Sequence, residues 1–338
     1  MGPTLRILRA GPGATIQDQG RRGYLRFGVT MAGPMDWMSH ARANILAGNP
    51  EGAGAIEIGV GGIEMEAEGG AIVLGYHGAP FAVSRNASAL PSAGRVRLGA
   101  GDRLTVKATA HGSWFYVSAA GGLLLSPVMG SLATSLRTGI GPPPLAAGDA
   151  LALGQTADLP ELACEAAALA ALPAKIRVVL GPQDDCFTAR GLETFFGEHF
   201  RISVRSDRMG YRLEGPPIEH AQGYNIVSDA IALGAVQIPG DGMPIVLMAD
   251  HQPTGGYPKL AHVIRADIGR LAQCRPGEAV QFAPISVQTA RTELFAALHA
   301  IRSTLERPLS ADSPDLSSEH LLSVNLISGV RAAFDQAG

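Results

Sequence analysis

Cysteine is scarce in this sequence of 338 residues, which contains only Cys164, Cys186 and Cys274. Their number is odd and no two have the C-x-x-C spacing, so the sequence predicts neither a disulfide framework nor a structural zinc site. No metal-binding set is expected. Free thiols are typical of a reducing compartment, and we therefore expect a cytoplasmic protein.

Long apolar runs and basic clusters are also missing. The N-terminus, MGPTLRILRAGPG, has no apolar stretch long enough for a signal peptide, and nowhere do about eighteen uncharged apolar residues follow one another. The formal net charge is −3 and no run of Lys or Arg could neutralise a phosphate backbone. The expected partners are small polar molecules or other proteins, not nucleic acid or a membrane.

Short phosphate-binding and hydrolase motifs are absent as well. The chain has no G-x-x-x-x-G-K-[ST] loop, no G-x-S-x-G and no H-E-x-x-H. The segment TGGYPK at residues 254–259 does not replace a phosphate loop, because Pro258 lacks the backbone N–H that would bind a phosphate. No local motif therefore places an ATP site in this chain.

Glycine and proline, in contrast, are abundant, at 43 and 23 residues. Tight turns separate short alternating segments, as in residues 61–87, which is typical of strands. An acidic turn followed by apolar alternation recurs in GDRLTV, GDALAL and GEAVQF, and each predicts a strand. Apolar residues recur at helical spacing in 35–49 and 288–301. The sequence predicts a mainly β fold with a few helices.

The length exceeds that of one typical domain, so two domains are expected. The composition turns Ala-rich, with Pro near either end, from Gln155 to Lys175, which indicates a linker containing a short helix. The predicted division is a first β domain at 1–160, the linker at 161–174 and a second β domain at 175–290. A C-terminal helix and a loosely ordered tail are predicted for 291–338.

Polar residues gather in glycine-rich turns, as in IQDQGRRGY, RSDRMGYRLEG, QIPGDGMP and DHQPTGGYPK. An Arg beside a glycine can present its planar fork to a carboxylate, so these clusters suit the recognition of a small anion. The alternative for the pair Asp207 and Arg208, and for Gln17 to Arg22, is a self-satisfied turn. Lys259 differs from them, because a lone lysine after a Gly-Gly-Tyr-Pro turn contributes little to the stability of that turn. Its position favours a role in binding a ligand.

Taken together and in order, five motifs resemble the allophanate hydrolase subunit 2, or KipA, family. They are TIQDQGRRGYLRFGVTMAGPMDWMSHARANILAGN, GPQDDCF, SDRMGYRLEG, GAVQIPGDGMPIVLMAD and TGGYPKLAHVIRADIGRLAQCRPGEAVQF. The match runs from about residue 5 to 287. In DHQPTGGYP, His251 and Pro253 depart from the family pattern. The resemblance implies a tandem of cyclophilin-like β-barrel domains.

The resemblance also implies an activity, that of the C subunit of an ATP-dependent 5-oxoprolinase complex, which opens a cyclic amide, 5-oxoproline, to glutamate. The implied partners are a KipI-like B subunit, present as a separate polypeptide, and an A subunit, with ATP bound through the complex. Two alternatives stay open. One is the carboxyltransferase component of a biotin-dependent urea carboxylase-like system, and the other is a non-catalytic antagonist that binds a KipI-like protein.

Under the first activity, the substrate carboxylate must be held and the lactam polarised. Arg208 or Lys259 is expected to hold the carboxylate, and Asp250, Gln252 and Thr254 to bond the ring amide. The predicted site lies in a pocket wall between two strands. The predicted catalytic residues are Asp250, Gln252 and Lys259, and the predicted substrate-binding residues are Arg208, Tyr211, Gln237, Thr254, Tyr257, Asp18 and Arg21.

Overall fold

The first half of the chain forms two antiparallel sheets that pack on one core. In a computed structural model, one sheet has the order β11-β1-β4-β9-β6-β7 and the other runs β2-β3-β10-β5-β8-β12. The strands are β1 (Thr4–Ala10), β2 (Thr15–Gln17), β3 (Ala55–Ile58), β4 (Ile63–Glu68), β5 (Ile72–Gly78), β6 (Ala82–Arg85), β7 (Ser88–Leu90), β8 (Ala93–Leu98), β9 (Arg103–Lys107), β10 (Phe115–Ala119), β11 (Ala150–Ala152) and β12 (Leu162–Cys164).

The alternation of apolar and polar residues along a strand determines which side chains face the core. In β4, Ile63, Met65 and Ala67 are buried in the core, while the three glutamates between and after them are only partly buried. β5 is buried along its whole length, because α1 (Trp37–Leu46) packs on it. The sheet and helix approach closely at Gly75, where a Cβ atom would lie 2.3 Å from the backbone N of Ala47.

The second half forms a closed barrel with the strand order β13-β20-β17-β18-β15-β14-β21. Its strands are β13 (Ala174–Leu180), β14 (Phe200–Ile202), β15 (Gly210–Glu214), β17 (Ala235–Gln237), β18 (Ile245–Leu247), β20 (Lys259–Val263) and β21 (Ala279–Pro284). A separate two-stranded ribbon consists of β16 (Asp229–Ala230) and β19 (Thr254–Gly255). The barrel encloses its own apolar core, which includes Phe195, Phe200 and Phe282.

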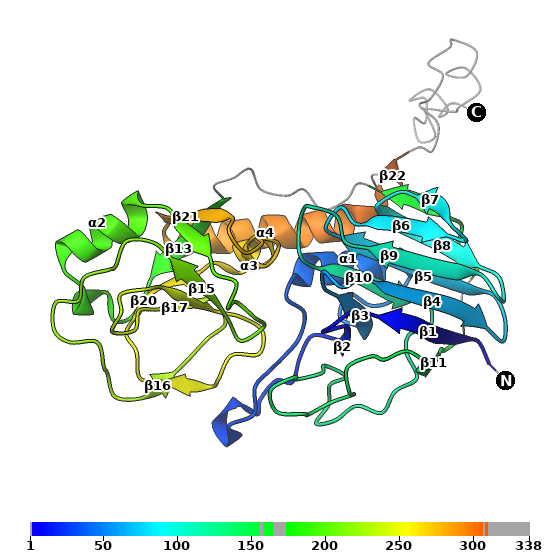
Figure 1. The fold of residues 1–338 in the computed structure, drawn as a ribbon, viewed down its shortest axis with the longest axis horizontal. Helices are drawn as coiled ribbons and strands as arrows, with labels where there is room; N and C mark the ends of the chain where they lie inside the picture. The colour runs from blue at the N-terminus through cyan, green and yellow to red at the C-terminus, as the bar shows by residue number, and fades with distance from the viewer. Residues whose placement is uncertain (1, 156–157, 165–173, 307, 310–338) are drawn as a thin grey trace, which may run out of the picture. The chain divides into compact units, whose positions relative to one another are not determined.

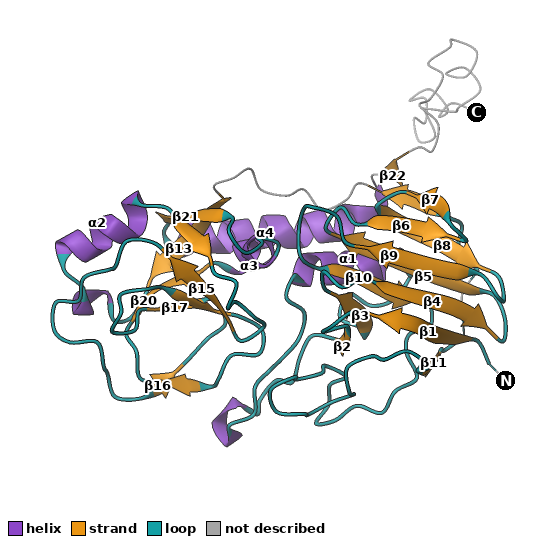
Figure 2. Ribbon diagram, viewed as in Figure 1, coloured by secondary structure: helices purple, strands orange, loops and turns teal. Residues whose placement is uncertain are grey.

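Helices lie along and between these two β regions (Figure 2). α2 (Ala189–Gly197) packs on β21, and α3 (Arg265–Ala272) contacts α1. The long helix α4 (Val287–Arg302) runs past both β regions in Figure 1 and contacts α1 and α3. The short elements are η1 (Leu25–Phe27), η2 (Asp184–Cys186), η3 (Ser303–Glu306) and β22 (Pro308–Leu309).

The structure describes residues 2–155, 158–164, 174–306 and 308–309. Met1–Pro308 forms one compact unit, so the two β regions and α4 pack as a single body. No helix within the described residues combines the length and apolar character needed to cross a membrane.

The predicted fold class is confirmed, since the chain is mainly β with a two-sheet region followed by a closed barrel. The helices predicted within 35–49 and 288–301 are α1 and α4, and the three turn-plus-strand motifs are β9, β11 and β21. The short helix predicted between Gln155 and Lys175 falls largely outside the described residues. The predicted domain limits stay a prediction: 165–173 and 310–338 lie outside the described residues, and the described part of the linker contains β12. α2 and α3 were not predicted, because each is short and carries a glycine within its span.

Candidate functional site

Arg208 connects the two halves of the molecule. It lies within a turn in which Asp207 Oδ1 accepts hydrogen bonds from the backbone N–H groups of Met209 (2.8 Å) and Gly210 (3.2 Å). Asp207 therefore forms a self-satisfied turn, as the structural alternative predicted, but Arg208 is not its partner. The Arg208 guanidinium instead binds Asp250 through Nε (3.1 Å) and Nη2 (3.0 Å), and pairs with Glu57 through Nη1.

We call Arg208, Asp250 and Glu57 the junction triad. All three side chains are almost fully buried. Glu57 Oε2 also accepts hydrogen bonds from the backbone N–H of Met35 and from the hydroxyl of Tyr116, both at 2.8 Å. Burial raises the pKa of Glu57, and Arg208 opposes that rise. Burial alone would lower the pKa of Arg208, but the two carboxylates raise it overall, so the guanidinium stays charged.

Arg208 has few donors left for a ligand. Its Nη2 also donates to the carbonyl of Gly33 (2.7 Å), so its hydrogen bonds go to Asp250, Glu57 and this carbonyl. Removing one member of a buried charge group leaves the others unpaired, which costs several kcal/mol. These contacts favour a role in which Arg208 orients Asp250, rather than one in which Arg208 binds a substrate carboxylate.

Asp18 and Arg21 hold a loop of the first half. Asp18 accepts hydrogen bonds from Gly20 N, Ser131 Oγ and Leu132 N. The fully buried Arg21 donates to the carbonyls of Val128 (3.2 Å) and Ala133 (2.5 Å). Both residues thus have internal partners, although Arg21 Nη1 has none among the described residues. Burial lowers the pKa of Arg21, and the nearby charges of Asp18 and Asp250 oppose this.

The segment from Asp250 to Lys259 starts at the junction triad and ends in the barrel. His251 follows Asp250, is buried, and its Nδ1 lies 2.7 Å from the carbonyl of Gln252. A carbonyl only accepts, so Nδ1 carries the proton and Nε2 of the neutral ring keeps a lone pair. The side chains of Gln252 and Thr254 make no hydrogen bond within the described part of the chain.

Lys259 and Gln237 lie side by side at one end of the barrel, where the last residue of β17 pairs with the first of β20. Lys259 Nζ is 3.0 Å from Asp229 Oδ2, and its backbone N–H donates to Gln183 Oε1 (3.1 Å). Gln237 Nε2 reaches the carbonyl of Tyr257 at 3.5 Å. We call Lys259, Asp229, Gln183 and Gln237 the Lys259 cluster. Thr254 and Tyr257 are exposed beside it.

Tyr211 also lies between the two halves of the molecule. Its hydroxyl donates to the carbonyl of Ala272 (2.8 Å) and accepts from Trp114 Nε1 (3.2 Å), so it links the two halves near α3. Burial raises its pKa. The structure therefore brings Arg208 together with Asp250, Lys259 with Gln237, and Asp18 with Arg21, and the charge of Asp250 also acts on Arg21. Tyr211 makes its hydrogen bonds to Trp114 and Ala272, while the charges of Glu57 and Arg208 act on its hydroxyl.

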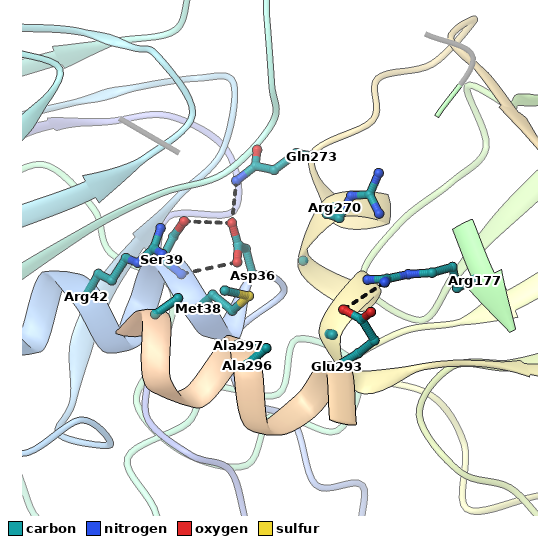
Figure 3. A pocket seen from close by; sticks show the side chains of 13 residues that line it. Asp36, Met38, Ser39, Arg42, Arg177, Arg270, Gln273, Glu293, Ala296 and Ala297 are labelled. Carbon is teal, nitrogen blue, oxygen red and sulfur yellow. Dashed lines mark hydrogen bonds and ion pairs between the residues drawn. The ribbon is translucent and has the colours of Figure 1, made fainter. Parts of the chain in front are cut away.

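A cavity of about 430 Å³ lies between α1, α3 and α4 and contains none of the predicted residues (Figure 3). Its acidic groups already have partners. Asp36 accepts hydrogen bonds from Ser39 and from Gln273 Nε2 (2.9 Å), and Glu293 pairs with Arg177 (2.8 Å). Among the described residues that line this cavity, no carboxylate is free to act as a base. We interpret the hydrogen bonds and the ion pair around it as contacts that hold the two halves of the molecule together.

Sequence reasoning missed Glu57, Asp229 and His251. Glu57 and Asp229 are single acidic residues in segments without a distinctive motif, and no local signal marks them. His251 departs from the family pattern, and that departure was the one signal that could have drawn attention to it.

Three buried or half-buried histidines predict how the stability of the fold depends on pH. Burial lowers the pKa of His40, His251 and His262. Their folded pKa values lie below the unfolded value of about 6.5, so the stability they contribute is present above pH 6.5 and is lost as pH falls below it. We expect His40→Gln to reduce the slope of unfolding free energy against pH below 6.5 by up to about 1.4 kcal/mol per pH unit. Denaturant unfolding at several pH values tests this, with exposed His111→Gln as control; equal slopes would contradict it.

Comparisons with known proteins agree with this architecture. The family model described as "Carboxyltransferase domain, subdomain A and B" matches residues 27–284. The chain is 36% identical to the C subunit of 5-oxoprolinase from Escherichia coli over 290 residues, 85% of this chain and 93% of that protein. It is 37% identical to the 5-oxoprolinase C subunit of Haemophilus influenzae, over 82% of this chain and 90% of that protein.

A solved structure shows the same fold. The Kluyveromyces lactis urea carboxylase superimposes with a TM-score of 0.84 and 27% sequence identity, covering 91% of this chain and 30% of that one. The chain thus corresponds to about a third of that larger protein and to nearly the whole of each 5-oxoprolinase C subunit. The sequence resemblance is confirmed, and the chain belongs to the carboxyltransferase domain (subdomain A and B) family, with the C subunits of 5-oxoprolinase among its relatives.

Proposed function

We propose that this chain is the C subunit of an ATP-dependent 5-oxoprolinase complex, which opens the lactam of 5-oxoproline to give glutamate. The observation that carries the proposal is identity of 36–37% along nine-tenths or more of two 5-oxoprolinase C subunits. In contrast, the chain matches only a part of the urea carboxylase.

The chemistry assigns roles to the segment from Asp250 to Lys259. A lactam is a poor electrophile, and ATP would supply a phosphoryl group that activates its oxygen toward water. This chain would then hold the substrate. Lys259 is the cation for the substrate carboxylate, and the free side chains of Gln252 and Thr254 are available for the ring amide. Arg208 fixes the orientation of Asp250 through two hydrogen bonds.

The partners in this proposal are a KipI-like B subunit and an A subunit. The relatives are named as one subunit of an enzyme, which supports a multi-subunit assembly. ATP binds elsewhere in that complex, since the sequence contains no phosphate loop.

Co-expression of the tagged chain with its presumed A and B partners tests the proposal. We expect a complex to co-purify and to convert 5-oxoproline to glutamate only when ATP is present, with product followed by NMR. A complex that forms and binds its partners but yields no glutamate would favour the regulatory alternative instead.

Carboxyl transfer is the second candidate, favoured by the family model and by the fold of the urea carboxylase. Biotin would carry the carboxyl group in that reaction. Lys259 could neutralise either the carboxylate of 5-oxoproline or the carboxyl group carried by biotin. Avidin separates the two candidates. Under our proposal, avidin leaves glutamate formation unchanged and no label passes from [14C]bicarbonate into an amide. Avidin-sensitive labelling of urea or another amide would establish carboxyl transfer.

A further inference from the structure

Lys259 is a buried cation with an accessible partner. Its side chain is 2% exposed, whereas that of Asp229, 3.0 Å from its Nζ, is 52% exposed. Asp229 is its one ion-pair partner within the described residues. A carboxylate that reaches solvent can leave its partner, provided another anion takes its place.

The contrast with Arg208 decides which of the two predicted carboxylate-binding cations is available. The partners of Arg208 are Glu57 and Asp250, and both are buried. Displacing either of them would leave a buried charge with neither an ion-pair partner nor water around it. Asp229, which is 52% exposed, would regain its hydration on leaving. The remaining cost is the unpaired Lys259, which an incoming carboxylate would remove.

The strand that carries Asp229 is weakly held. β16 pairs with β19 over two residues each, and this ribbon is separate from the barrel sheet. Figure 1 shows β16 beyond the end of the barrel at which β17 and β20 are labelled. Two backbone hydrogen bonds flank the ribbon, Ile226 N to Gly256 O (2.9 Å) and Ile231 N to Pro253 O (3.0 Å). A two-stranded ribbon of this size adds little stability of its own. The segment is anchored at one end by the buried side chain of Ile231, which packs with Ala235 and Leu247.

The surroundings of Lys259 suit a carboxylate. Gln183 Oε1 accepts a hydrogen bond from the backbone N–H of Lys259. Lys259 lowers the pKa of Asp229, and the Gln183 side chain contributes a smaller part of this effect. Gln237 lies on the neighbouring strand and keeps its amide within 3.5 Å of the carbonyl of Tyr257. Asp229 is held by Lys259 Nζ at one carboxylate oxygen (3.0 Å) and by the backbone N–H of Ala230 at the other (2.7 Å). An incoming carboxylate would find the ammonium of Lys259 with amide side chains beside it as donors.

We infer that Asp229 occupies the position of the substrate carboxylate, and that the β16–β19 ribbon must move for a ligand to reach Lys259. The inference rests on the proposed function for the identity of the ligand, 5-oxoproline. The carboxyl group of a carboxylated donor shares the same chemistry. Asp229 thus acts as an internal competitor that keeps Lys259 neutralised when the site is empty.

Lysine labelling tests the inference without catalysis. The chain contains three lysines, Lys107, Lys175 and Lys259, and the first two are exposed, so they serve as internal standards. With an amine-acylating reagent and mass spectrometry, we expect Lys259 to react at least about tenfold more slowly than the standards. Asp229→Ala should raise its rate severalfold, and Asp185→Ala, which removes an exposed carboxylate without an ion pair, should not.

Ligand protection in Asp229→Ala identifies the class of ligand. 5-Oxoproline should slow the labelling of Lys259, and 2-pyrrolidinone, the same ring without the carboxylate, should not. Protection by bicarbonate alone would assign the site to a carboxyl donor. Equal labelling of Lys259 in wild type and Asp229→Ala, or equal protection by both lactams, would overturn the inference.

Kinetics of the complete complex give a second readout. Asp229→Ala should lower KM for 5-oxoproline by at least about threefold with little change in kcat, because a competitor has been removed, and Asp185→Ala should leave both unchanged. A raised KM for Asp229→Ala would show that Asp229 positions Lys259 and would refute competition. If the wild-type complex makes no glutamate, the proposed function fails, while the labelling experiment still decides whether Asp229 covers Lys259.

Discussion

Arg208→Met is expected to lower the free energy of unfolding by about 3–5 kcal/mol. Methionine has a similar length but no charge, so Glu57 and Asp250 would remain buried without their cation. Because Glu57 belongs to the first β region and Asp250 to the barrel segment, the loss should be accompanied by weaker association of the two halves. Urea unfolding followed by circular dichroism measures the change.

Two comparisons separate this effect from a general loss of arginine. Arg201→Met removes an exposed guanidinium that donates to the carbonyl of Gly277, and it should cost less than about 1 kcal/mol. Adding Glu57→Gln and Asp250→Asn to Arg208→Met should recover more than half of the lost stability, since no buried charge is then unpaired. A loss below about 1 kcal/mol for Arg208→Met itself would contradict the assigned role of the junction triad.

Gly75→Ala is expected to destabilise the first half by about 3 kcal/mol. The added Cβ would lie 2.3 Å from Ala47 N and 2.4 Å from the carbonyl O of Ala43, so α1 would have to move away from β5. These are backbone atoms of a packed helix, which cannot turn aside as the end of a side chain can. Thermal unfolding of the purified variant measures the effect.

The matched control is Gly197→Ala, at the end of α2, where an added Cβ meets nothing within 4 Å. It should change stability by less than about 1 kcal/mol, in either direction. If Gly75→Ala behaved like Gly197→Ala, α1 would not be held against the sheet as closely as the structure shows.

Local patterns in the sequence were sufficient to predict several elements of the fold. The helical spacing of apolar residues within 35–49 predicted α1, and the turn-plus-strand motifs predicted β9, β11 and β21. The short helix α3 was missed, because its eight residues continue an apolar run from β20 and contain Gly269, which weakens a helical pattern.

The pairing of charges could not be predicted in the same way. Arg208 was an expected binding residue, but its partner Glu57 lies 151 residues away, and only the folded chain brings them together. The same holds for Lys259, whose lone position after the Gly-Gly-Tyr-Pro turn suggested a binding role. That its charge is already balanced by Asp229 follows from the position of the β16–β19 ribbon, which no sequence motif indicates.

Glutamate release from 5-oxoproline with ATP, in a mixture of this chain with its A and B partners and then with each protein omitted in turn, tests the central claim most directly. The account predicts that omitting this chain alone reduces glutamate release to the uncatalysed background and that adding it back restores the rate. Release that continues at the full rate without this chain would contradict its assignment to the oxoprolinase complex.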